Sequence, residues 1–164
     1  MAEALEGWAD FNVAMVGAAA ALAGLLIVAM SVNIAAIMSS PELVSRAGAS
    51  IAGLALAIVA SAVGLMPVGS ATGYAVAVLV ASLGAGAFQL AAIRAIIRNG
   101  RDTTAERIVR GGIGTLAIAA FAVGSVLVLT GADDTGLLVI GFGAVIAVVA
   151  SILMAWVVLV EVLR

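Results

Sequence analysis

The 164-residue sequence contains neither cysteine nor histidine. Without cysteine the chain forms no disulfide and offers no thiolate to a metal, a haem or a substrate. Without histidine it also lacks the commonest general base and the commonest metal-ligating side chain. Most nucleophile–base pairs and most transition-metal sites are thereby removed. We therefore expect a protein that is not an enzyme, with no catalytic residue, no metal site and no cofactor.

Charged and aromatic residues are scarce as well. Charged residues make up 10% of the chain and aromatic residues 4%, whereas hydrophobic residues make up 65%. A typical soluble protein has about 25% charged residues. So few polar side chains cannot cover a surface that water must wet. The composition therefore predicts a membrane protein.

The apolar residues are grouped into five long runs. A helix needs about 20 residues to cross a hydrocarbon core of about 30 Å, and each run is about that long or longer. The runs are continuously apolar and do not alternate between two faces, which favours helices over β-strands. We predict an all-α, polytopic membrane protein in which residues 1–164 form a single domain, a bundle of five transmembrane helices with short loops. The predicted spans cover about residues 13–38, 47–66, 74–97, 108–129 and 137–163.

The segments between the runs carry helix-boundary signals. In "SSPEL", Ser40 is suited to cap a helix whose first residue is Pro41, the position at which a missing N–H does no harm. In "MPVGSATGY", one proline and two glycines end the second span. Tyr74 follows them, and its amphipathic ring is suited to the membrane interface. The second and third helices are therefore predicted on either side of this segment.

Basic residues are concentrated on one side of the predicted membrane. Cytoplasmic segments near span ends are enriched in Lys and Arg, and translocated segments are depleted of them. With five spans, all basic residues fall on one side, and Asp133 and Asp134 fall on the other together with the acidic N-terminal segment. We therefore predict a plasma (inner) membrane protein with its N-terminus outside and its C-terminus in the cytoplasm. The basic residues are Arg46, Arg94, Arg98, Arg101, Arg107, Arg110 and Arg164.

Five of these arginines lie close together in "AAIRAIIRNGRDTTAERIVRGG". One interpretation is that they set the orientation and attract anionic lipid heads, a contribution of about 1 kcal/mol per charge. The other is a docking site for a phosphate, a lipid head or an acidic partner, formed by Arg94, Arg98 and Arg101 at helical spacing, with Arg107 and Arg110 facing them. A nucleic-acid partner is not expected, because the basic segment is short and no aromatic residues are interleaved with it.

Uncharged polar residues occur at similar depth on all five spans, in the half that is predicted to be cytoplasmic. One interpretation is interhelical packing, in which such side chains contribute about 0.6 kcal/mol each through hydrogen bonds. The other is a solvated cavity or an oligomeric pore, with the amides of Asn33 and Gln89 replacing water around a solute or an ion. The residues of this candidate polar layer are Ser31, Asn33, Ser50, Gln89, Thr115 and Ser151.

The stretch "FNVAMVGAAAALAGLLIVAMSVNIAAIM", followed by "PELVSRAGAS", covers residues 11–50. It resembles the opening of a widespread group of small, largely uncharacterised bacterial membrane proteins. The "AALAGL" run carries this resemblance, together with Gly17, Ser31, Asn33, Pro41 and Arg46. The resemblance implies a multi-span inner-membrane protein and brings no activity with it.

Two functions from different classes follow from these features. The first is a non-enzymatic accessory, scaffold or regulatory subunit that acts through helix packing and the basic cytoplasmic loop. The second is a homo-oligomeric channel or facilitator for ions or small solutes. The expected partners are membrane lipids with anionic heads on the cytoplasmic face, together with either further copies of the chain or another membrane protein.

Overall fold

A computed structural model of the chain describes residues 5–67, 70–99 and 104–161, without the side chains of residues 99, 104–110, 160 and 161. All regular structure in these residues is helical. Five helices are long and apolar enough to cross a bilayer, which confirms the predicted fold of a helical membrane protein. They are α2 (Ala9–Val32), α4 (Pro41–Gly64), α5 (Ala71–Asn99), α6 (Thr104–Leu129) and α7 (Asp133–Trp156), and α7 continues into the π-helical turn η1 (Val157–Glu161).

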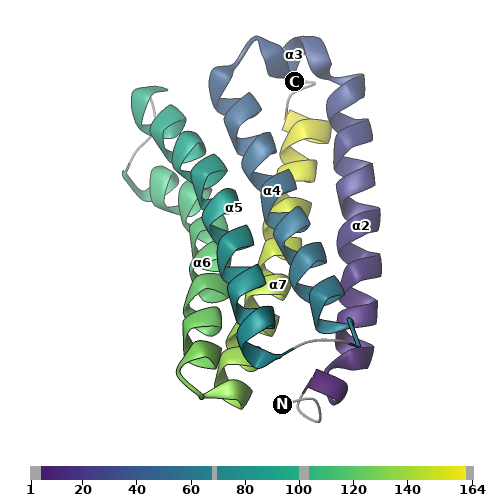
Figure 1. The fold of residues 1–164 in the computed structure, drawn as a ribbon. Coiled ribbons are helices and arrows are strands. Elements are labelled where there is room, and N and C mark those ends of the chain that lie inside the picture. The colour runs from purple at the N-terminus through teal and green to yellow at the C-terminus, as the bar shows by residue number, and fades with distance from the viewer. Residues whose placement is uncertain (1–4, 68–69, 100–103, 162–164) are drawn as a thin grey trace.

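The first apolar run is interrupted at Asn33, so its last residues belong to a separate short helix. Asn33 has φ −106° and ψ 22°, outside the helical range, and its side-chain Nδ2 donates to the carbonyl of Ala29 at 3.1 Å. The short helix α3 (Ile34–Met38) then leads the chain across to α4 (Figure 1). Hydropathy does not reveal this break, because the residues of α3 are as apolar as those of α2.

The helix boundaries after the first span follow local chemistry. Ser40 caps α4 by accepting a hydrogen bond from the backbone N–H of Leu43 at 3.4 Å, and Pro41 is the first helical residue, both as predicted. Between α6 and α7, Gly131 has a φ of +88°, a conformation that other residues rarely adopt. The N–H groups of Gly131 and Ala132 bond to the carbonyls of Val128 and Leu127, which forms the Schellman motif that ends many helices.

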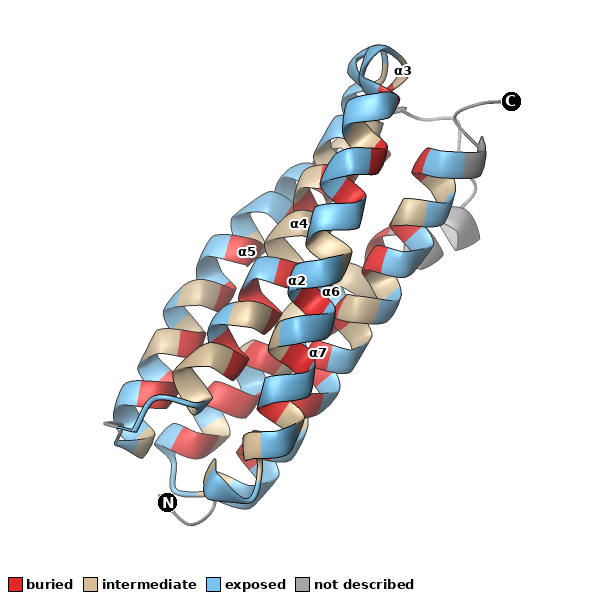
Figure 2. Cartoon of the chain, turned by 90° about the vertical axis from the view of Figure 1, so that its right-hand side faces the viewer, coloured by how far each residue is buried: buried red, intermediate tan, exposed pale blue. Residues whose placement is uncertain are grey.

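Four helices form a closed ring. α4 contacts α5, α5 contacts α6, α6 contacts α7, and α7 contacts α4 again, while α2 packs outside the ring against α4 and α7 (Figure 1). We call the end of the bundle that carries α3 the α3 end, and the end with the α4–α5 and α6–α7 connections the far end. The outward faces of the helices are exposed along the whole bundle (Figure 2). They carry large apolar side chains such as Leu25, Leu83 and Phe142, as a surface in contact with lipid does.

α6 and α7 are closest in the half of the bundle near the far end. A Cβ on Gly136 would lie 2.7 Å from the carbonyl oxygen of Gly124, and a Cβ on Gly143 would lie 3.1 Å from the Cβ of Ala120. Glycine at both positions lets the two backbones approach, as small residues do in membrane helix pairs. Toward the α3 end the same two helices diverge (Figure 1).

Candidate functional site

A cavity of about 700 Å³ lies at the α3 end, inside the ring formed by α4, α5, α6 and α7. Ligand sites in proteins typically have volumes of about 300–1,000 Å³. The cavity lies where α6 and α7 diverge, and small residues, among them Gly53, Ala117 and Ala147, form part of its lining. Its polar lining residues are Ser39, Ser40, Glu42, Arg46, Ser50, Gln89 and Ser151.

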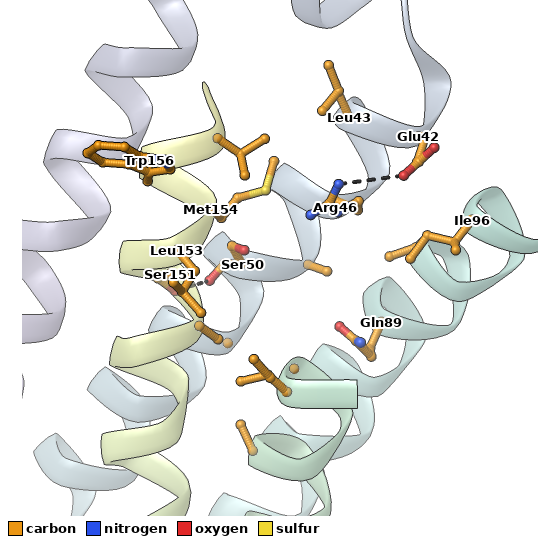
Figure 3. A pocket seen from close by; sticks show the side chains of 18 of the residues that line it. Glu42, Leu43, Arg46, Ser50, Gln89, Ile96, Ser151, Leu153, Met154 and Trp156 are labelled. Atoms are coloured by element: carbon orange, nitrogen blue, oxygen red, sulfur yellow. Dashed lines mark hydrogen bonds and ion pairs between the residues drawn. The ribbon is translucent and has the colours of Figure 1, made fainter. Parts of the chain in front are cut away.

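The first two turns of α4 supply both charges of the cavity. Glu42 and Arg46 are four residues apart, and Arg46 Nη1 lies 3.5 Å from Glu42 Oε1 (Figure 3). Glu42 is only 8% exposed, although its carboxylate would lose much hydration free energy if it were buried alone. Arg46 and the positive end of the α4 dipole compensate for this loss. Both side chains also have interactions beyond this pair.

Deeper in the cavity, uncharged polar side chains connect neighbouring helices. Ser151 Oγ donates to the carbonyl of Ala147 at 2.9 Å and lies 3.4 Å from the carbonyl oxygen of Ser50, which links α7 to α4. Gln89 Nε2 donates to the carbonyl of Gly111 at 2.9 Å and to Thr115 Oγ1 at 3.1 Å, which links α5 to α6. Figure 3 shows the side chains of Ser50, Gln89 and Ser151 around the same space.

The residues of the predicted polar layer therefore do not all meet in one place. Ser50, Gln89 and Ser151 line the cavity, and Thr115 is exposed and bonded to Gln89 without lining it. Asn33 is buried at the contact between α2 and η1, where its Nδ2 donates to the carbonyl of Val158 at 3.3 Å. Ser31 is exposed, and its hydroxyl donates to the carbonyl of Ile27 in its own helix.

Only part of the basic cluster falls within the described structure. Arg94 and Arg98 are exposed on the last turns of α5, at the α3 end. Arg101 lies outside the described residues, and so do the side chains of Arg107 and Arg110 on α6. The predicted clamp between the two sides of this loop therefore remains a prediction.

Sequence reasoning missed the charged pair of the cavity. Arg46 entered only the topology and the resemblance, and Glu42 was not among the predicted site residues. The available signal was the spacing of the two residues, because an acid and a base four positions apart lie on one helix face. The position of that face, toward the interior of the bundle, depends on how α4 packs and is not visible in the sequence.

The cavity has apolar walls and ends within the bundle. Ile96, Leu153, Met154 and Trp156 form part of the walls (Figure 3). Beyond Ala117 and Ala147 the interior is filled by buried side chains such as those of Phe121 and Ala144. A molecule in the cavity would therefore meet polar groups, apolar walls and a packed floor.

No family model matches the chain, and no curated protein or solved structure is significantly similar to it. Within the described residues, no group of three or more acidic side chains is suited to hold a metal ion.

Proposed function

We propose that the protein is a carrier or facilitator for a small polar organic solute, and that the cavity at the α3 end is its binding site. The observation that supports this proposal is a cavity of ligand size, set among membrane-spanning helices, with a carboxylate, a guanidinium, an amide and hydroxyl groups on its wall. Polar groups retained at membrane depth are typical of substrate pathways, because they are costly when they serve packing alone.

The one-sided shape of the cavity favours a carrier over an open pore. The cavity lies at the α3 end, and closely packed side chains fill the bundle beneath it. Asn33 and Gln89 also lie in different places, at the α2–η1 contact and on the cavity wall, so they do not line one path within a single chain. A carrier that is open to one side at a time accounts for both features.

The orientation is part of the proposal. Arg46, Arg94 and Arg98 lie at the α3 end, and Asp133 and Asp134 begin α7 at the far end. By the positive-inside rule the α3 end faces the cytoplasm of a bacterial inner membrane, and the binding site is reached from there.

Uptake by proteoliposomes tests this function. Gly53 lines the cavity, and a Cβ there meets no atom within 4 Å, so Gly53→Leu fills the cavity without a clash at its Cβ. Gly24 is equally unobstructed but exposed on α2, so Gly24→Leu is the matched control. With labelled glycine and glycerol as probes, we expect uptake of at least one by the wild type and the control, and its loss in Gly53→Leu. Equal uptake by all three proteins, or by protein-free liposomes, contradicts the proposal.

A second function has a specific observation in its favour. Arg94 and Arg98 are exposed one helical turn apart at the α3 end, which suits an accessory or regulatory subunit that contacts anionic lipid heads or an acidic partner. Native mass spectrometry of protein released from phosphatidylglycerol bilayers tests the lipid contact. We expect fewer retained lipids for the double variant Arg94→Gln and Arg98→Gln, and equal retention would remove the support for this function.

A further inference from the structure

A second buried polar cluster lies near the far end, separate from the large cavity. It consists of Asn12 on α2, Ser61 on α4 and Tyr74 on α5, which line one small cavity together with residues of α7. Their exposed fractions are 6%, 3% and 4%. Tyr74 stands in the first turn of α5, and its ring is buried inside the bundle. Within the described part of the chain, no residue forms a hydrogen bond with any of these three side chains.

The other fully buried serines behave differently. Ser82, Ser125 and Ser151 each donate their hydroxyl to a carbonyl three or four residues earlier in the same helix. Ser61 lies within a regular helix and has the same option, but its hydroxyl forms no such bond. A buried hydroxyl without a partner loses a substantial part of its hydration free energy, and Ser61 lines the small cavity, so the partner is to be sought there.

Two glycines bring the cluster together. A Cβ on Gly64 would lie 2.7 Å from Nδ2 of Asn12, so the amide packs directly against the backbone of α4. A Cβ on Gly141 would lie 2.8 Å from Cζ3 of Trp8, the residue that precedes α2 and lines the same cavity. The amide of Asn12 is therefore held against α4 inside the bundle, and the residue is almost completely buried.

We propose that one water molecule is bound between Asn12, Ser61 and Tyr74 and joins α2, α4 and α5. The small cavity has a volume of about 10 Å³, and a buried water needs about 10–15 Å³ and makes about three hydrogen bonds. The three side chains supply that number of partners. A hard cation fits less well, because it requires about six oxygen ligands and none of the lining residues is a carboxylate.

The bound water stabilises the packing of the helices at the far end of the bundle. It connects three helices that are otherwise held together there by apolar contacts, on the side of the bundle opposite the large cavity. This inference does not depend on the proposed function, because a protein that carries no solute would bind the same water.

Water-to-protein magnetisation transfer in nanodiscs tests the site directly. The methyl groups of Ala60 and Ala144 line the small cavity and carry no exchangeable protons. Ala57 is buried nearby on α4 but lines neither cavity, which makes its methyl group the matched control. We expect transfer from water to Ala60 and Ala144 and none to Ala57. Equal signals at all three methyl groups, or none at any, would overturn the proposal.

Thermal unfolding provides a second, independent test. Ser61→Ala and Tyr74→Phe each remove one side-chain hydroxyl that binds the water, so the water and its remaining partners lose a hydrogen bond. We expect each variant to lower Tm by about 2–4 °C. Because both hydroxyls share one water, the double variant should lose less than the sum. Ser82→Ala is the control, since its hydroxyl bonds only within its own helix. If the hydroxyls have no partner, both substitutions leave Tm unchanged or raise it, and the proposal fails.

Discussion

Gly124 and Gly136 face each other across the contact between α6 and α7. A Cβ added to either glycine would lie 2.7 Å from the carbonyl oxygen of the other. The two backbones are therefore too close for a side chain between them, and this contact lies in the half of the bundle away from the cavity. The divergence of α6 and α7 beyond it leaves the space in which a solute can bind.

This contact predicts that Gly136→Ala destabilises the protein. The new methyl group would meet Gly124 O at 2.7 Å and the backbone nitrogen of Val128 at 2.9 Å, and neither atom can move aside alone. Overpacking of this kind costs about 1–3 kcal/mol. Gly17→Ala is the control, because Gly17 is exposed on α2 and a Cβ there meets nothing within 4 Å. Reversible unfolding in bicelles measures both, and equal stabilities would contradict the account of the contact.

The turn between α6 and α7 makes a second prediction. Gly131 has open space around a Cβ but a φ of +88°, so Gly131→Ala is strained by its backbone alone. A left-handed conformation costs an L-residue about 1–2 kcal/mol. We expect Gly131→Ala to lower the free energy of unfolding by about this amount, while Gly131→Asn, which tolerates this conformation better, lowers it less. Equal losses in both variants would show that φ is not the cause.

Gln89 is predicted to hold α5 against α6. Gln89→Leu removes the bonds to Gly111 O and Thr115 Oγ1, and membrane hydrogen bonds contribute about 0.6 kcal/mol each on average. We therefore expect a loss of about 1 kcal/mol. Thr115→Val removes only one of these two links between α5 and α6, together with the bond that Thr115 Oγ1 donates to Gly111 O within α6, and it leaves Gly111 O still bonded to Gln89, so it should cost no more than Gln89→Leu. The prediction is wrong if Thr115→Val destabilises the protein more than Gln89→Leu does.

The absence of cysteine makes the orientation measurable with single-cysteine variants. Thr130 is exposed at the far end and Ser39 is exposed at the α3 end. With a membrane-impermeant maleimide we expect Thr130→Cys to react in intact cells, and Ser39→Cys to react only after the cells are opened. The reverse pattern would invert the proposed topology and would place the cavity on the outer side.

The sequence predicts the helices well because each depends on local properties. Length and hydropathy define the spans, and the cap at Ser40 requires only a serine before a proline. The packing of the bundle depends on which residues lie close together in space, and the composition does not predict this. Gly17 and Gly124 look alike in a chain rich in glycine and alanine, yet only Gly124 lies in a tight contact.

The candidate site is predictable only in part, for the same reason. Helical depth placed Ser50, Gln89 and Ser151 at one level, and the structure brings them to one cavity. Depth does not give the rotation of a helix about its axis, so the sequence alone does not separate Ser31, which is exposed, from the three residues that line the cavity. The rotation of α4 about its axis also determines that Glu42 and Arg46 face the cavity, and the rotation of α5 determines that the ring of Tyr74 is buried.

The most direct test of the proposed function is access of water-borne reagents to the cavity. Ser50 lines the cavity on α4, whereas Ser125 is buried on α6 and lines neither cavity. Each is replaced by cysteine and exposed to a membrane-impermeant, cationic thiosulfonate from one side of oriented vesicles at a time. We predict that Ser50→Cys reacts only from the side of the α3 end, and that Ser125→Cys is unreactive from both sides. An unreactive Ser50→Cys, or one that reacts from the far end, would contradict a solute cavity open at the α3 end.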